Sequence, residues 1–204
     1  MANVTTDATP WIDEARRDPA LLGTKLERYR HYLKLLARVE IGRKLQSKVD
    51  ESDVVQEAFL DAHHYFPTFR GHAEAQFVHW LREILAGSLA KQIRRYFGTK
   101  ARDPRLEHGL LADLDHSADS LAAIPVIDPQ TSPSQQAMAA EQSLVLADRM
   151  ATLPPDYQTV LVLRHIEGLT FPEVAELMGK TVDSVEKLWM RGLTQLKRAM
   201  KDQA

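Results

Sequence analysis

Residues 155–200 read PDYQTVLVLRHIEGLTFPEVAELMGKTVDSVEKLWMRGLTQLKRAM, and their pattern predicts three consecutive helices. Apolar residues recur there at three- and four-residue spacing, as on one face of a helix. Gly168 is placed to end the first helix, and Gly179 breaks the chain before the third. Thr170 and Glu173 have the spacing of a capping box that starts the second helix. The last two helices are therefore predicted to form a helix-turn-helix.

A helix-turn-helix favours DNA as its ligand, because an α-helix fits the major groove and the short turn projects the second helix outward. Thr181 is placed to cap that second helix. The side chains expected on its exposed side, near base edges, are Thr181, Asp183, Ser184, Lys187 and Arg191. Lys197, Arg198 and Lys201 follow where phosphate contact is expected. A plain helical hairpin with a solvated basic end is the alternative for this segment taken alone.

The chain upstream is also predicted to be helical, because apolar residues recur at helical spacing and no stretch alternates strictly. One apolar stripe consists of Leu26, Tyr29, Leu33, Leu36 and Val39. A second, after the candidate N-caps Asp50 and Ser52, consists of Val54, Val55, Ala58, Phe59 and Ala62. Pro67 and Gly71 predict a loop over residues 65–72. A long helix follows, with an apolar side of Phe77, Leu81, Ile84, Leu85, Leu89, Ile93 and Tyr96 and a cationic side of Arg82, Lys91, Arg94 and Arg95.

Helical periodicity fades from Gly98 to Gln135, where Pro residues appear among Asp, Ser and Ala. This composition predicts a flexible linker, with a short helix near Leu110–Leu114. We therefore expect an all-α protein of two small helical domains joined by that linker. The expected boundaries are 1–19 for an N-terminal extension without an interpretable motif, 20–98 for the first domain, 99–136 for the linker and 137–201 for the second domain.

The formal net charge of −2 hides a segregation of charge along the chain. Residues 16–48 carry ten Lys/Arg against three Asp/Glu, and residues 82–105 carry seven against two. Residues 106–148 carry seven Asp/Glu and no Lys or Arg. Basic blocks on both sides of an acidic stretch favour contact with nucleic acid at separate places, although solvated basic helix faces give the same pattern.

Other classes of protein are excluded by composition. The chain has no cysteine, which excludes disulfides and thiolate metal sites. It has no apolar run near the roughly 18 residues of a membrane span. Its N-terminus, with Asp7, Asp13 and Glu14, does not resemble a signal peptide. We therefore expect a cytoplasmic protein.

Three segments in order resemble one known family. Residues 52–59, SDVVQEAF, resemble the region 2 helix by which sigma factors grip the clamp helices of the polymerase β′ subunit. Residues 77–95, FVHWLREILAGSLAKQIRR, are similar to the next helix, which opens the minus-ten element. Residues 153–197 are similar to sigma region 4, the reader of the minus-thirty-five element. The combination resembles the extracytoplasmic-function (ECF) branch of the sigma-70 family, which keeps only regions 2 and 4.

The resemblance implies a sigma factor that binds core RNA polymerase and directs promoter recognition and DNA melting. It implies no catalysis, no cofactor and no metal. The implied partners are core RNA polymerase, through its β′ clamp helices and β flap, and promoter DNA, with an anti-sigma factor as a further candidate. The acidic linker is expected either to thread through basic polymerase channels or to serve as a solvated tether.

Site residues follow from the same resemblance, position by position. The polymerase-binding residues are Asp53, Gln56 and Glu57. The minus-ten residues are Phe69, Arg70, Trp80, Lys91, Arg94 and Arg95. The minus-thirty-five residues are Thr181, Ser184, Lys187, Arg191 and Arg198. Within the loop, Phe66, Phe69, Arg70 and His72 match the segment that captures a flipped base, and Trp80 is open to either a stacking or a core role.

Two rival interpretations differ in class. An ordinary helix-turn-helix regulator with a helical sensory domain shares the output-domain pattern, and it would bind duplex DNA unaided. A helical metal-dependent hydrolase would use the stripe Asp53, Glu57, Asp61 and His64, although such a carboxylate stripe is usually a solvated helix face.

Overall fold

Helices provide the regular structure throughout the described chain, residues 9–45, 49–100 and 132–201 of a computed structural model, and no strand occurs in those ranges. The elements are α1 (Pro10–Ala15), α2 (Pro19–Glu27), α3 (Arg30–Leu45), α4 (Glu51–Tyr65), the 3-10 turn η1 (Phe66–Thr68), α5 (Glu74–Lys100), α7 (Pro133–Ala151), α8 (Pro155–His165), α9 (Phe171–Met178) and α10 (Val182–Lys201). The all-α prediction is confirmed.

Two compact units divide the chain, Met1–Leu144 and Val145–Ala204. Helix α7 starts four residues before the predicted Ala137 and continues across the boundary between the units. Most of the expected linker, including the short helix predicted near Leu110–Leu114, lies outside the described residues.

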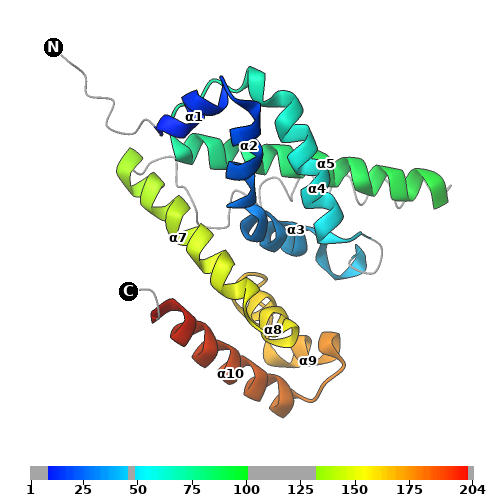
Figure 1. Cartoon of the computed structure of the whole chain (residues 1–204). Helices are drawn as coiled ribbons and strands as arrows, with labels where there is room; N and C mark the ends of the chain where they lie inside the picture. The colour runs from blue at the N-terminus through cyan, green and yellow to red at the C-terminus, as the bar shows by residue number, and fades with distance from the viewer. Residues whose placement is uncertain (1–8, 46–48, 101–131, 202–204) are drawn as a thin grey trace. The chain divides into compact units, whose positions relative to one another are not determined.

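The first unit is built around the pairing of α4 with α5, and Figure 1 shows α5 crossing α2 and α4 before its C-terminal end extends beyond them. Asp50 caps α4 by accepting a hydrogen bond from the backbone N–H of Ser52 at 2.6 Å, as predicted. Most residues of the predicted apolar stripes are buried, among them Val54, Val55, Ala58, Phe77, Leu81, Leu85 and Leu89, whereas Val39 and Ile84 are half-buried. Each such large side chain contributes roughly 1.5–3 kcal/mol when it leaves water.

Arg82 departs from the prediction, because it lies in this core and not on the cationic side of α5. Its exposed fraction is only 7%, and its Nη2 has no hydrogen-bond partner among the described residues. The neighbouring Tyr32 is also buried, which raises the pKa of its hydroxyl to about 12 even though the Arg82 charge acts in the opposite direction. Arg82 is therefore not available to hold a phosphate in this conformation.

The second unit has the predicted helix-turn-helix. Thr170 and Glu173 form the capping box, in which the Glu173 carboxylate accepts from the Thr170 backbone N–H at 2.8 Å. Gly168 and Gly179 both have left-handed backbones, with φ of 70° and 60°. At Gly192 a Cβ would lie 3.3 Å from Tyr157 Cβ, so the missing side chain lets α10 approach α8 closely. The second helix of the motif is thereby fixed against the other two.

Candidate functional site

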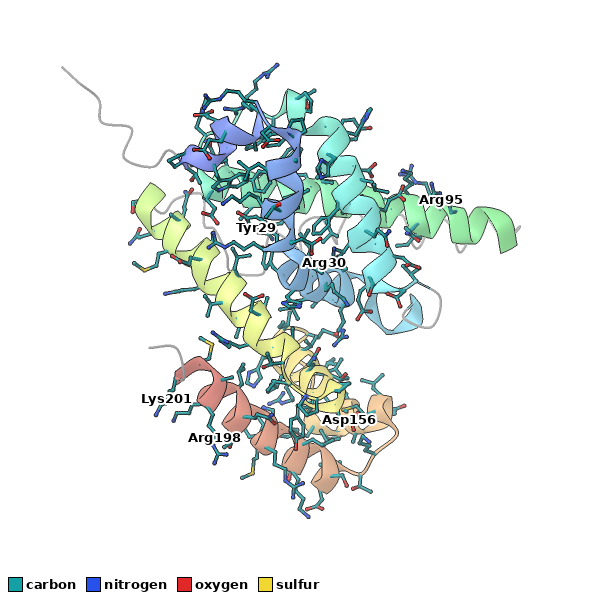
Figure 2. All side chains as sticks on the ribbon, viewed as in Figure 1. Tyr29, Arg30, Arg95, Asp156, Arg198 and Lys201 are labelled. Carbon is teal, nitrogen blue, oxygen red and sulfur yellow. The ribbon has the colours of Figure 1, made fainter. Side chains whose placement is uncertain are left out.

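The exposed face of α10 carries the residues predicted to read duplex DNA. Thr181, Lys187, Arg191 and Arg198 are exposed, and Ser184 is half-buried. The Thr181 hydroxyl oxygen accepts from the backbone N–H of Ser184 at 3.3 Å and so caps the helix, as predicted. Lys187 pairs with Asp183 at 2.7 Å, one turn earlier. Figure 2 shows Arg198 and Lys201 near the end of α10, directed away from α8.

An aromatic and histidine cluster holds this reading helix in place. The indole N–H of Trp189 on α10 donates to His165 Nε2 at 2.9 Å, so this nitrogen acts as the acceptor. Phe171, at the start of α9, meets the Trp189 ring edge-on with centroids 5.4 Å apart. The Arg164 guanidinium lies 4.5 Å from the Phe171 ring centroid. Four residues from three helices, two of them from α8, thus hold α10 at its angle to α8 and α9.

Helix α4 presents a polar surface on the side opposite its core stripe. Asp53 and Gln56 are exposed on this side. Leu60 lies one turn farther along and is 62% exposed, which gives the surface an apolar centre. Glu57 differs from Asp53 and Gln56, because its side chain is half-buried and is turned towards α5.

Glu57 joins residues that the sequence assigned to two different partners. Its carboxylate accepts a hydrogen bond from Lys91 Nζ and lies 3.7 Å from Arg95 Nη2. Asp61 lies 3.8 Å from the same Lys91 Nζ and accepts from the Ser88 hydroxyl at 2.9 Å. The hydrogen bond from Lys91, more than the nearby charges, lowers the pKa of Glu57, and the same bond raises the pKa of Lys91. A residue predicted to bind polymerase therefore pairs with two predicted to bind DNA.

The carboxylate stripe does not form a metal site. Glu57 and Asp61 are engaged by α5, as described above, and across the ranges the structure describes no group of three or more His, Asp or Glu side chains has a metal-binding arrangement.

The prediction for Phe69, in the loop after η1, has to be corrected. Phe69 is predicted to be available for DNA, but its side chain is only 7% exposed and lies within an aromatic cluster. Its ring centroid is 5.7 Å from that of Phe77 and 5.0 Å from that of Trp80. Burial in this cluster excludes stacking on a base in this conformation, so Phe69 acts as a core residue. Arg70 and His72 are the exposed members of the loop.

Trp80 lies at the border of this cluster. It is half-exposed, and its ring also contacts Phe77 with centroids 5.5 Å apart. One side of the indole is therefore supported by core residues while another part reaches solvent. The core contact of Trp80 is thus observed, and its stacking on DNA stays a prediction.

Helix α1 and Arg16, the residue that follows it, contact the loop, and this contact was not predicted. Arg16 donates to the backbone oxygens of Gly71 at 2.6 Å and Phe69 at 3.4 Å, and Trp11 packs edge-on against Phe77 with centroids 4.9 Å apart. Thr9 followed by Pro10 is the local signal for a helix start that was available in the sequence.

Comparison with known proteins identifies the family. A family model described as "Sigma-70, region 4" matches residues 143–196. The ECF RNA polymerase sigma-E factor of Haemophilus influenzae is 30% identical over 139 residues, which cover 68% of this chain and 68% of that protein. The chain belongs to the ECF branch of the sigma-70 family.

Further relatives agree with this membership. The ECF RNA polymerase sigma-E factor of Escherichia coli K12 is 26% identical over 137 residues, which cover 67% of this sigma factor and 66% of the relative. A solved structure titled "Structure of CnrH in complex with the cytosolic domain of CnrY" aligns over 95% of this chain and 96% of that one, at 21% identity and a TM-score of 0.31. Family membership depends on the sequence matches.

The region 4 match covers the helix-turn-helix of this sigma factor. Residues 143–196 run from within α7 to within α10, and they include the capping box, Gly179 and the exposed Lys187 and Arg191. The geometry described for α10 is thus the geometry of a sigma region 4. Within the described ranges, no helix combines the length and the apolar character needed to cross a membrane.

Proposed function

We propose that this sigma factor initiates transcription by dividing three binding tasks between its two units. Residues 20–98 bind core RNA polymerase and open the minus-ten element, and residues 137–201 bind the minus-thirty-five duplex. The chain acts by binding, without catalysis of its own, in the cytoplasm where polymerase and chromosome meet. The observation that carries the proposal is that one unit presents a polar α4 surface beside a cationic α5, while the other presents an exposed cationic reading helix.

Duplex reading is assigned to the first three turns of α10. Thr181, Ser184, Lys187 and Arg191 lie at the N-terminal part of this helix, where side chains reach base edges in the major groove. Arg191 has the planar donor fork that matches guanine O6 and N7. Arg198, two turns farther on, is assigned to phosphate.

Strand opening is assigned to the surface formed by the loop and α5. Arg70 is exposed, and Trp80 has an aromatic surface reaching solvent, a combination suited to a phosphate and a stacked base. Arg94 and Arg95 are exposed farther along α5, and Figure 2 shows Arg95 on the part of this helix that extends past the bundle. Lys91 contributes only when DNA phosphate replaces Glu57 as its partner.

Polymerase docking is assigned to Asp53, Gln56 and Glu57 of α4, with Asp53 as the residue best suited to a test. Its side chain is exposed, so a substitution there leaves the core intact. We expect Asp53→Lys to reduce retention on core polymerase at least about tenfold, which corresponds to about 1.4 kcal/mol. Glu14→Lys makes the same charge change on exposed α1 and serves as the control, with retention and helical circular dichroism unchanged. Equal retention of both variants would refute the assignment.

The whole function is tested by transcription in vitro. Purified core polymerase with this chain should start transcripts at specific sites in a pool of genomic promoters, whereas core alone should not. Duplex binding by the free chain without any polymerase-dependent transcript would instead indicate a regulator, and the proposal would be abandoned.

A further inference from the structure

The segment before α2 holds the backbone of the loop that follows η1. The Thr9 backbone N–H donates to the His72 carbonyl oxygen at 2.8 Å, and the Thr9 hydroxyl accepts from the Glu74 backbone N–H at 3.0 Å. Arg16 approaches the same loop from α1 and donates to the carbonyl oxygens of Phe69 and Gly71. Four backbone groups of residues 69–74 therefore have partners supplied by two residues of the N-terminal segment.

Arg16 is itself held in a fixed direction. Its Nη1 pairs with Asp13 one turn earlier on α1, and the same nitrogen lies 3.3 Å from His72 Nδ1. The planar guanidinium then directs Nη2 at the two loop carbonyls, a geometry that a lysine ammonium does not reproduce.

Helix α1 keeps its place without Arg16. Ile12 and Ala15 are buried, and the Trp11 ring packs on Phe77. On the other side of the loop, Gln76 Oε1 accepts from the backbone N–H groups of His72 and Ala73 at 2.9 and 3.2 Å. Loss of the Arg16 side chain therefore removes the partners of the Phe69 and Gly71 carbonyl oxygens, while the buried Phe69 ring and the surrounding helices remain anchored.

We propose that Arg16 is a positioning residue for promoter opening, which fixes the backbone of residues 69–72 so that Arg70 and His72 face the separated strand. This role rests on the proposed function of the loop. Arg16 acts through the loop and does not touch DNA. A loop held in its binding conformation avoids the ordering cost that a mobile loop bears when it binds, so the bracing favours the open complex.

The test compares Arg16→Ala with Arg17→Ala in the full chain bound to core polymerase, on a promoter that the parent holoenzyme selects. Arg17 is the adjacent exposed arginine, and its Nε donates only to the Asp13 carbonyl oxygen of its own helix, at 3.3 Å. Permanganate reactivity of unpaired thymines measures opening, and a filter or gel assay at low temperature measures the closed complex. We expect Arg16→Ala to slow opening about tenfold, as loss of hydrogen bonds to a charged group predicts, with an unchanged closed complex. Arg17→Ala should open at the parent rate.

Two further measurements separate positioning from a general structural role. A template already unpaired over the minus-ten element should bind Arg16→Ala more weakly than Arg17→Ala, because the loop still has to be ordered when it binds the single strand. Arg16→Ala added to Arg70→Ala and His72→Ala should be no slower than those two substitutions alone, because the contacts that Arg16 positions are already gone. The thermal midpoint of the free protein should stay the same for all variants except for small surface effects.

Four outcomes overturn this role. Parental opening by Arg16→Ala does so, as does parental binding of Arg16→Ala to the unpaired template. A further loss when Arg16→Ala is added to Arg70→Ala and His72→Ala places Arg16 outside the pathway through the loop. Failure of the parent holoenzyme to open any promoter refutes the proposed function itself, and is recognised because it does not depend on the variant.

Discussion

The two units of this sigma factor differ in where the partners of their cations lie. In the first unit, Lys91 and Arg95 of α5 approach the Glu57 carboxylate of α4. In the second unit, Lys187 pairs with Asp183 on its own helix, and among the described residues Arg191 and Arg198 form no ion pair and are exposed. A ligand of α5 would therefore compete with a pair that joins two helices, whereas a ligand of α10 would compete only with a pair within one helix.

A second contrast concerns what lies beneath each surface. The α10 surface is an outer helix face, and at Lys187, Arg191 and Arg198 substitutions remove exposed side chains. The loop surface of the first unit lies directly on an aromatic cluster that is part of the core. Binding and stability are therefore separable in the second unit and coupled in the first.

The largest expected effect is a loss of stability when the core under the loop is disrupted. Phe69→Ala should lower the free energy of unfolding by about 3–5 kcal/mol, because it leaves a cavity between Phe77 and Trp80. Urea unfolding followed by tryptophan fluorescence reports it, since Trp80 contacts the deleted ring. Tyr65→Ala, an aromatic removal at a residue 47% exposed, should change the value by less than about 0.5 kcal/mol. Similar values for the two variants would contradict the burial of Phe69.

The next largest effect concerns the sequence specificity of DNA binding, with the stability of the fold unchanged. Arg191→Ala should cost about 1–3 kcal/mol of discrimination at one or two base pairs of the upstream element. Arg198→Ala should weaken all sequences alike and reduce the salt dependence by about one phosphate contact. Both are measured by holoenzyme binding to a panel of single-base variants at several salt concentrations. A uniform loss from Arg191→Ala would assign that residue to phosphate, and the reading surface would have to be moved.

The smallest expected effect concerns the ion pair between Glu57 and Lys91 in the first unit. Because the pKa of Glu57 is lowered in the folded protein, its ion pair stabilises the fold at pH values above the ordinary pKa of a glutamate. This contribution is lost as the pH falls through the lowered pKa. Lys91→Met should raise the pKa of Glu57 towards its ordinary value, because the hydrogen bond that lowers it is lost. Carbon-detected NMR titration of the Glu57 carboxyl measures it. Arg94→Met removes a neighbouring exposed cation and should leave the Glu57 titration unchanged; an equal shift in both variants would argue against the specific pair.

Local sequence signals predicted the second unit well. Thr170, Glu173, Gly168 and Gly179 act within a few residues of their own positions, so spacing alone locates the capping box and both helix ends. The exposure of Arg191 follows equally from the helical period.

The first unit required information that periodicity does not contain. Phe69 is buried because rings from α5 meet it, and these contacts join residues far enough apart in sequence that no local pattern records them. Lys91 was placed correctly on a polar side of α5, but the acidic partner on α4 appears only when the two helices pack. The bracing by Arg16 links positions 55 residues apart and has no helical or strand repeat to reveal it.

Gly71 leaves room for the Phe69 ring, so the residues tolerated at positions 69 and 71 depend on each other. A Cβ at position 71 would lie 2.4 Å from the tip of the Phe69 ring, far inside van der Waals contact. Alanine at 71 therefore requires the Phe69 ring to shift within its aromatic cluster, whereas a shorter side chain at 69 would leave room for it. The two positions are coupled, so substitutions made one at a time underestimate what the pair tolerates.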